Sequence, residues 1–210
     1  MGKNTVSMAV VRRLPRYYRY LGELLNNDVA RVSSKDLSEK MGLTASQIRQ
    51  DFNCFGGFGQ QGYGYNVELL HNEIGNILGL NEVKNCILVG AGNLGRALGN
   101  HLNFKRRGFQ LVGIFDVSEN IVGKSIGGIT VQHVDEMETL LRDMKVEMAI
   151  LTAPKEETIA IVDRLIACGI YGFWNFSNMD IQREGVYFEN VHLGDSLMTL
   201  CYSMSNDHHE

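Results

Sequence analysis

Residues 86–95 read Cys-Ile-Leu-Val-Gly-Ala-Gly-Asn-Leu-Gly, and this stretch decides the fold of the larger part of the chain. The four residues before the first glycine predict a short buried strand, and those after the last glycine predict a helix that runs to Phe104. A second predicted strand, Leu111 to Phe115, is followed at once by Asp116. A strand, a glycine-rich turn, a helix and a second strand ending at a carboxylate are together typical of a dinucleotide-binding unit.

Each glycine in this turn has a separate physical role. Gly90 makes the tight turn, Gly92 lets the backbone approach a pyrophosphate, and Gly95 lets helix and strand pack closely. The N–H groups at the start of the helix attract the phosphates. Asp116 would accept hydrogen bonds from the adenosine ribose and repel a 2′-phosphate, which favours NAD over NADP, but Lys124 is near enough in sequence to leave NADP open. Another phosphate-bearing ligand, such as coenzyme A, and a vestigial site are the alternatives.

Strands and helices continue to alternate towards the C-terminus. The pattern predicts a helix over 135–145, a strand over 148–151, a helix over 155–168 and a strand over 171–176, which indicates an α/β domain with a Rossmann-like parallel sheet. Ligands of such sheets bind at the carboxyl ends of the strands, where an ordinary loop residue is the equal alternative. The candidate cofactor-binding residues are Gly90, Ala91, Gly92, Asn93, Leu94, Gly95, Asp116, Val117, Lys124, Thr152, Ala153, Pro154, Asn175 and Phe176.

The first 80 residues follow a different pattern. A helix is predicted from Leu14 by apolar residues at helical spacing. A hydroxyl residue then precedes an acid or an amide by three positions at Ser33–Asp36 and again at Thr44–Gln47, which is the spacing of a capping box. Because only residues 41–43 separate the two predicted helices, the region has the outline of a helix-turn-helix.

The second of these two helices has one apolar and one polar face. Positions 45, 48, 52 and 55 form the apolar stripe, and the polar stripe consists of Ser46, Arg49, Gln50 and Asn53. These polar side chains can read base edges in a major groove. A solvated surface is the alternative, but the capped helix before and the glycine-rich stretch after favour a DNA-reading helix.

Residues 56–65 hold five glycines and three aromatic residues. This composition predicts a tight β-hairpin that lies along a DNA backbone as a wing, with a flexible linker as the alternative. Asn66 is predicted to cap a helix over 67–77 that Gly79 ends. The expected domains are therefore 1–80 and 81–189, followed by a C-terminal segment, 190–210.

The C-terminal segment predicts one more helix. Its apolar residues lie on one face, at Leu193, Leu197, Leu200 and Met204. Such a helix either folds back on its own domain or exchanges with a second subunit.

The composition, 44% hydrophobic and 21% charged among 210 residues, is that of a folded soluble protein. No apolar run is long enough to span a membrane, no secretory signal is recognisable, and four scattered cysteines indicate reduced thiols, no metal site and a cytoplasmic chain. The net charge of −4 is uneven: residues 1–80 carry nine Lys and Arg against seven Asp and Glu, whereas residues 81–210 carry 11 against 17. A polyanion is thus expected to meet the first part.

A DNA-reading unit and a dinucleotide unit on one chain resemble the Rex family, the redox-sensing transcriptional repressors of bacteria, over about residues 8–204. The matching stretches are Thr-Ala-Ser-Gln-Ile-Arg-Gln-Asp (44–51), Phe-Gly-Gly-Phe-Gly (55–59), Gly-Tyr-Gly-Tyr-Asn-Val (62–67), Gly-Ala-Gly-Asn-Leu-Gly (90–95) and Phe-Asp-Val (115–117). The resemblance implies a homodimer of winged-helix domains that binds a pseudo-palindromic operator. It also implies Rossmann domains that bind NADH or NAD⁺, a C-terminal helix swapped into the partner, and release of DNA when NADH/NAD⁺ rises.

The same resemblance implies that the chain is not an enzyme. The rival interpretation, an NAD-dependent oxidoreductase, requires a proton donor beside the nicotinamide. His101, His133 and His192 are the candidates, and none of them stands in a recognisable catalytic arrangement.

The resemblance also assigns roles to individual residues, with Arg49 and Gln50 facing the bases. The candidate DNA-binding residues are Ser34, Thr44, Ser46, Gln47, Arg49, Gln50, Asn53, Gln60, Gln61, Tyr63 and Tyr65. The candidate dimer and switch residues are Arg16, Arg19, His101, His192 and Asp195, and Arg12 is expected on the same helix face as Arg16 and Arg19. These three arginines either contact DNA phosphates or pair with the swapped helix, with an exposed row of charges as the alternative.

Three features depart from the family pattern. Gln60 and Gln61 stand where family wings usually carry basic residues, and Gln50 stands where many members have lysine. His101 takes the place of a common tyrosine. His192 takes the place of an acidic residue at the start of the swapped helix, for which Asp195 is the candidate substitute as a partner of Arg19.

Overall fold

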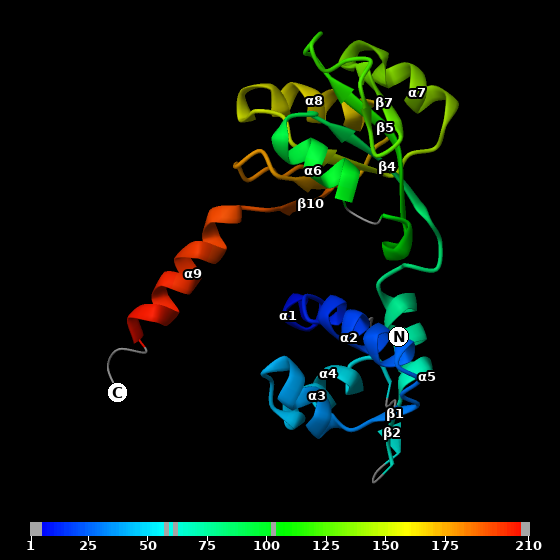
Figure 1. Cartoon of the computed structure of the whole chain (residues 1–210), viewed down its shortest axis with the longest axis vertical. Helices are drawn as coiled ribbons and strands as arrows, with labels where there is room; N and C mark the ends of the chain where they lie inside the picture. The colour runs from blue at the N-terminus through cyan, green and yellow to red at the C-terminus, as the bar shows by residue number, and fades with distance from the viewer. Residues whose placement is uncertain (1–5, 57–58, 61–62, 102–103, 207–210) are drawn as a thin grey trace. The chain divides into compact units, whose positions relative to one another are not determined.

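The computed structural model describes residues 6–56, 59–60, 63–101 and 104–206. Their contacts divide the chain into two compact units, Met1–Glu82 and Val83–Glu210 (Figure 1).

The first unit packs helices against a small antiparallel sheet. Its described helices are α1 (Met8–Val11), α2 (Leu14–Asn26), α3 (Ser34–Met41), α4 (Ala45–Asn53) and α5 (Val67–Ile77). Its strands, in the order β1-β3-β2, are β1 (Arg31–Val32), β3 (Gly64–Asn66) and β2 (Gly59–Gln60). The unit is a winged helix-turn-helix, in which α3 and α4 form the helix pair and β2 and β3 form the wing.

Local hydrogen bonds explain where these helices begin and end. Ser33 and Asp36 form a complete capping box at the start of α3, and the Thr44 hydroxyl accepts a hydrogen bond from the Gln47 N–H, 3.1 Å away, at the start of α4. Gly42 ends α3 with a left-handed φ of 64°, which glycine adopts without steric cost.

The second unit is built on a seven-stranded sheet of order β10-β9-β8-β4-β5-β7-β6. Its described strands are β4 (Lys84–Val89), β5 (Phe109–Asp116), β6 (Ser125–Ile126), β7 (Ile129–His133), β8 (Met148–Leu151), β9 (Gly172–Asn175) and β10 (Tyr187–Asn190). All neighbours pair in parallel except β6 and β7, which form an antiparallel edge. The unit is a Rossmann-like domain, as the sequence predicts.

Helices cover both faces of this sheet (Figure 1). They are α6 (Asn93–His101) on one face and α7 (Met137–Asp143) and α8 (Lys155–Ala167) on the other, with short 3₁₀ helices at Lys105–Arg107 and Val134–Glu136. Two separate apolar clusters result, because alternate residues of β4 point to opposite faces: Ile87 and Val89 join the α7–α8 side, and Cys86 and Leu88 join the α6 side.

The structure corrects some expected element boundaries. The helix expected over 135–145 begins as a 3₁₀ turn and ends at Asp143. The strands β6, β7 and β10 were not predicted, because they are short and lie towards the edges of the sheet, where a continuous apolar run is not needed.

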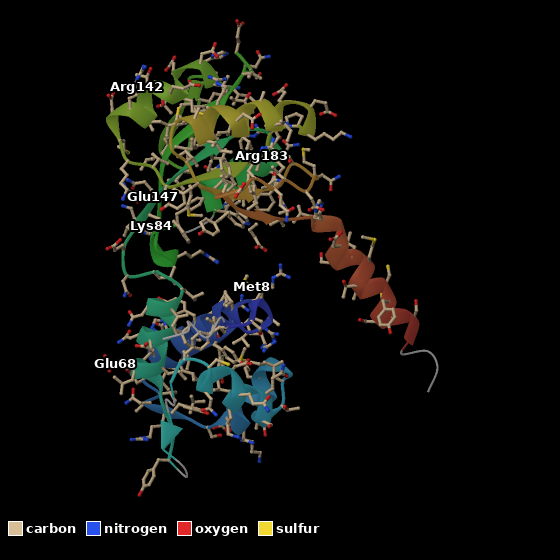
Figure 2. All side chains as sticks on the ribbon, turned by 180° about the vertical axis from the view of Figure 1, so that it is seen from behind. Met8, Glu68, Lys84, Arg142, Glu147 and Arg183 are labelled. Atoms are coloured by element: carbon tan, nitrogen blue, oxygen red, sulfur yellow. The ribbon has the colours of Figure 1, made fainter. Side chains whose placement is uncertain are left out.

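The last helix, α9 (Leu193–Asn206), does not fold back on its own sheet. Every side chain from Leu193 to Ser205 is exposed, as the free-standing sticks in Figure 2 illustrate. Glu147 is buried near Lys84, the first residue of the central strand β4 (Figure 2). Its carboxylate accepts a hydrogen bond of 3.0 Å from the Asn85 N–H.

Candidate functional site

The polar face of α4 is open to solvent. Ser46, Arg49, Gln50 and Asn53 are all exposed. Arg49 Nη1 donates a hydrogen bond of 3.1 Å to Ser34 Oγ at the start of α3, so two predicted DNA-binding residues from different helices lie together. Thr44 is exposed at the cap of α4, and Gln47 is half-buried beside it.

The opposite face of α4 holds a charged residue that is not among the predicted site residues. Asp51 is only 2% exposed, yet its carboxylate accepts three hydrogen bonds. Arg13 donates to it through Nε and Nη2, each bond 2.7 Å long, and the Tyr17 hydroxyl donates a third bond of 2.8 Å. The signal that could have found this network is an aspartate at an inward position, three residues after the buried Ile48.

The wing residues divide between surface and core. Tyr63 is 70% exposed, and the guanidinium of Arg31 lies 6.0 Å from its ring centroid. Gln60 belongs to β2, whereas Gln61 lies outside the described residues. Tyr65 corrects the prediction of a surface contact: its side chain is buried, with the ring packed edge-on against Phe52 at 5.0 Å, because β3 is the central strand of the small sheet.

The arginines near the N-terminus do not share one helix face. Arg12 lies in the turn between α1 and α2, because the first helix ends at Val11 and the next begins at Leu14. Arg16 and Arg19 are exposed on α2. Arg16 Nη2 donates a hydrogen bond of 2.9 Å to the Met41 carbonyl, which satisfies an otherwise free acceptor at the end of α3.

In the second unit a cavity of about 500 Å³ opens at the carboxyl ends of β4, β5 and β8. Its lining includes eight of the predicted cofactor residues, namely Gly90, Gly92, Asp116, Val117, Thr152, Ala153, Pro154 and Phe176. Ser177, which directly follows Phe176 after a predicted strand, also lines the cavity. Val89, Val134, Glu157, Ile161 and Asn178 line it as well and are not among the predicted residues. This is the edge of the sheet where ligands of open α/β folds bind.

The three glycines of the turn occupy different environments. Gly90 has a φ of 98°, and a Cβ there would lie 2.5 Å from the Ala153 nitrogen. A Cβ on Gly95 would overlap the Gly90 carbonyl oxygen, so α6 can approach β4 only because this position is glycine. A Cβ on Gly92 would meet nothing within 4 Å, because Gly92 faces the open cavity. Asn93 and Leu94 form the first turn of α6 behind it.

Asp116 connects the glycine turn to the end of β5. Its carboxylate accepts hydrogen bonds from the Ala91 N–H at 2.5 Å and from the Ser118 N–H at 2.8 Å. A carboxylate has about four acceptor positions, so two backbone bonds leave room for ligand hydroxyls. Ala91 itself is buried.

Beyond the glycine turn and the start of α6, two predicted cofactor residues do not line the cavity. Lys124 is exposed in the turn before β6 and is not part of the cavity lining. Asn175 is buried and serves the loop after β9: its amide donates to the Met179 carbonyl and to Asn190 Oδ1, and its Oδ1 accepts two bonds from Ser177. Both polar atoms of the Asn175 side chain are therefore engaged within the connection between β9 and β10.

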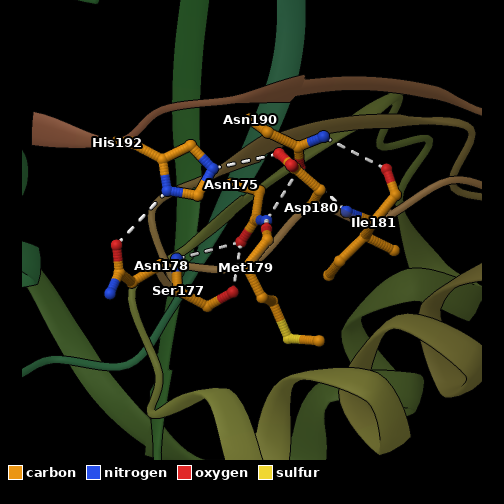
Figure 3. Close-up of polar contacts among 8 residues, drawn as sticks. All are labelled: Asn175, Ser177, Asn178, Met179, Asp180, Ile181, Asn190 and His192. Atoms are coloured by element: carbon orange, nitrogen blue, oxygen red, sulfur yellow. Dashed lines mark hydrogen bonds and ion pairs between the residues drawn. The ribbon is translucent and has the colours of Figure 1, made fainter. Parts of the chain in front are cut away.

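The loop after β9 also contacts His192, the residue directly before α9 (Figure 3). His192 Nε2 lies 3.0 Å from Asp180 Oδ1, and His192 Nδ1 lies 3.2 Å from Asn178 Oδ1. The hydrogen bond with Asp180 is the main cause that raises the pKa of His192 above its ordinary value. Of the other predicted switch residues, His101 is exposed at the end of α6 and Asp195 is exposed in the first turn of α9.

Two further findings concern the described part of the chain as a whole. Within it, no three His, Cys, Asp or Glu side chains are gathered closely enough to hold a metal ion. None of its helices has the length and apolar character that a membrane crossing requires.

Comparisons with known proteins agree with this geometry. Residues 5–53 match the family model of a putative DNA-binding protein N-terminus, and residues 81–179 match that of a CoA binding domain. A redox-sensing transcriptional repressor Rex of Thermoanaerobacter sp. (strain X514) is 52% identical over 206 residues, which cover 98% of this chain and 92% of the relative.

Solved structures give the same result. The crystal structure of RSP in complex with β-NAD⁺ and operator DNA matches with a TM-score of 0.89 and 52% identity, covering 98% of this chain and 95% of that chain. RSP in complex with β-NADH matches with a TM-score of 0.88 and 48% identity, covering 98% and 97%. With nearly its whole length aligned at about half identity, the chain belongs to the Rex family of redox-sensing transcriptional repressors.

Proposed function

We propose that this chain is a repressor that binds operator DNA through α4, holds NAD(H) in the cavity beside Gly92, and leaves the operator when NADH rises relative to NAD⁺. The observation that carries the proposal is the presence, on one chain, of an exposed polar face on a helix-turn-helix and of a cavity built around a dinucleotide-type glycine turn. We assign the first role to residues 1–80, the second to residues 81–189, and dimerisation to residues 190–210.

On the DNA side, α4 enters the major groove. Arg49 and Gln50 reach base edges, with Ser46, Gln47 and Asn53 beside them, and Ser34, Thr44, Tyr63 and the wing glutamines contact the backbone or the minor groove. Gln50, Gln60 and Gln61 are uncharged. Because each cation that neutralises a phosphate releases counterions, fewer cations mean a shallower dependence of affinity on salt.

On the ligand side, the residues present fit a dinucleotide. Open space at Gly92 and the N-terminus of the nine-residue α6 suit a pyrophosphate. The remaining acceptor positions of Asp116 suit ribose hydroxyls and oppose a ribose phosphate. This opposition favours NAD(H) over NADP(H) and over coenzyme A, which also carries a phosphate on its ribose.

The exposed apolar residues of α9 support the proposal of a dimer. Leu193, Leu197, Leu200 and Met204 are exposed in a single chain, and burying them against a second copy would recover about 25 cal/mol per Å² of apolar surface. We propose a homodimer with exchanged α9 helices, in which Asp195 of one chain meets Arg19 of the other and His101 lies near the same contact.

The ligand acts as a switch only if its two forms bind unequally to two dimer arrangements. Changing operator occupancy from nearly full to nearly empty requires about 5.5 kcal/mol of differential affinity. A dimer has two ligand sites, so each site must supply about half of this differential affinity. Its source is the difference in charge and ring shape between the two forms of the nicotinamide. The protein is not an enzyme, and its place is the cytoplasm, where its DNA and the NAD(H) pool meet.

The test is an operator selected from random duplexes, followed by gel-shift titration with each ligand form. NADH should weaken operator binding, and NAD⁺ should not. Equal effects of both forms would overturn the switch, and turnover of NADH with small carbonyl compounds would favour an oxidoreductase instead.

A further inference from the structure

We propose that Asp51 is a positioning residue for operator recognition: held by Arg13 and Tyr17, its carboxylate fixes the rotation of α4 about its own axis and so aims Arg49 and Gln50 at the bases. This inference rests on the proposed DNA-reading role of α4.

Three hydrogen bonds from Arg13 and Tyr17 hold the Asp51 carboxylate in a fixed orientation, and we call these three bonds the clamp. Arg13 Nε donates to Asp51 Oδ2 and Nη2 donates to Oδ1, both at 2.7 Å, which is the bidentate arrangement that fixes orientation as well as distance. Tyr17 adds a bond of 2.8 Å to Oδ2. Both donors come from the α1–α2 region, more than 30 residues earlier in the chain, so the clamp ties α4 to a different element.

Stability alone does not account for such a clamp. Burying a charged pair costs desolvation energy that its attraction often only offsets, and well-packed apolar residues of similar volume are frequently as stable or more stable. The apolar neighbours on the same face, Ile48 and Phe52, are already buried. The ion pair fixes the rotation of α4 about its axis. Apolar contacts tolerate small rotations of a helix, whereas a bidentate hydrogen bond does not.

A small rotation would matter for base reading. A helix with its side chains is about 10–12 Å across, so a turn of about 20° moves a side-chain tip by about 2 Å. Hydrogen bonds to bases tolerate only about 0.5 Å of variation in length. Since Arg49 and Gln50 directly precede Asp51 on α4, an angle fixed at Asp51 is transmitted to both through the rigid helix backbone.

The element that provides the clamp also holds the first helix of the pair. Arg16, three residues after Arg13, donates to the Met41 carbonyl at the end of α3. The Tyr17 ring packs edge-on against Phe52 at 4.9 Å. Residues 13–17 therefore contact both α3 and α4, which sets the two helices relative to each other.

The experiment measures, in the full chain, both the discrimination between operator and scrambled duplex and the thermal stability. The combined variant Arg13→Met, Tyr17→Phe, Asp51→Leu replaces the network by apolar side chains. Binding to the selected operator and to a scrambled duplex is measured by fluorescence anisotropy without dinucleotide, and thermal unfolding is recorded in parallel. We expect the operator affinity to fall by roughly 10- to 100-fold, the size of one lost base contact, while scrambled-duplex affinity and the melting temperature stay close to wild type.

The matched control is a bidentate ion pair in the other unit. Arg164 donates to Glu138 at 2.6 and 2.9 Å, and Arg164→Met with Glu138→Leu should leave the ratio of operator to scrambled affinity unchanged. If the combined variant does not fold, Asp51→Asn, which keeps the side-chain shape, replaces it and should show the same selective loss of operator affinity.

The outcomes separate this inference from the proposed function. A wild-type chain without preference for any duplex would contradict the proposed function itself. A wild-type chain that discriminates, together with an apolar variant or Asp51→Asn that discriminates equally well, overturns the positioning role of Asp51. A parallel fall in affinity for both duplexes would also overturn it, because that result means general loss of the domain.

Discussion

His192 Nδ1 lies 3.2 Å from Asn178 Oδ1, and this contact joins the residue before α9 to the lining of the cavity beside Gly92. α9 begins at the next residue, and Asn178 lines the cavity together with Ser177. A ligand that displaces this loop therefore acts directly on the helix that we assign to dimerisation.

The protonation state of His192 should control this junction. Both of its partners, Asp180 Oδ1 and Asn178 Oδ1, are oxygen atoms, and only the protonated ring carries an N–H on each nitrogen. Because the pKa of His192 is raised in the folded chain, its contribution to the junction is complete below the ordinary value of about 6.5 and is lost as pH rises through the raised value. An NMR titration of the His192 ring should show a midpoint above the ordinary value. Asp180→Asn should lower that midpoint. An unchanged midpoint would contradict the role of Asp180 in raising the pKa of His192.

Arg49→Ala should remove a base contact without affecting the other unit. We expect a loss of about 1–3 kcal/mol of operator affinity, measured by gel shift, with a much smaller effect on a scrambled duplex. Affinity for NADH, measured by fluorescence, should equal that of the wild type, because Arg49 belongs to the first unit. Loss of both activities together would mean that Arg49 supports the fold.

Two glycines of the turn should respond differently to substitution. Gly92→Val places a side chain in the open cavity, so NADH affinity should fall at least tenfold, about 1.4 kcal/mol, with little change in melting temperature. Gly95→Val drives a side chain into the Gly90 carbonyl, so the melting temperature should fall, since overpacking costs about 1–3 kcal/mol. Calorimetry and ligand titration on the same samples check both, and reversed effects would contradict the ligand position.

The apolar face of α9 should control the dimer. Leu197→Asp with Leu200→Asp places two charges on the exposed stripe and should yield monomers by light scattering. Ser203→Asp, on the same helix but outside that stripe, is the matched control and should leave the mass unchanged. A dimer that survives the leucine variant would mean that association uses another surface.

The sequence by itself determined the features that depend on near neighbours along the chain. The turn at Gly90, Gly92 and Gly95, the caps at Ser33, Thr44 and Asn66, and the polar face of α4 all followed from spacing, because capping bonds and helical periodicity act within a few residues. Only the tertiary structure decided where those side chains went. The pairing of Asp51 with Arg13, 38 residues away, the burial of Tyr65 and the use of Asn175 within its own loop depend on which distant segments pack together, and no local pattern encodes that choice.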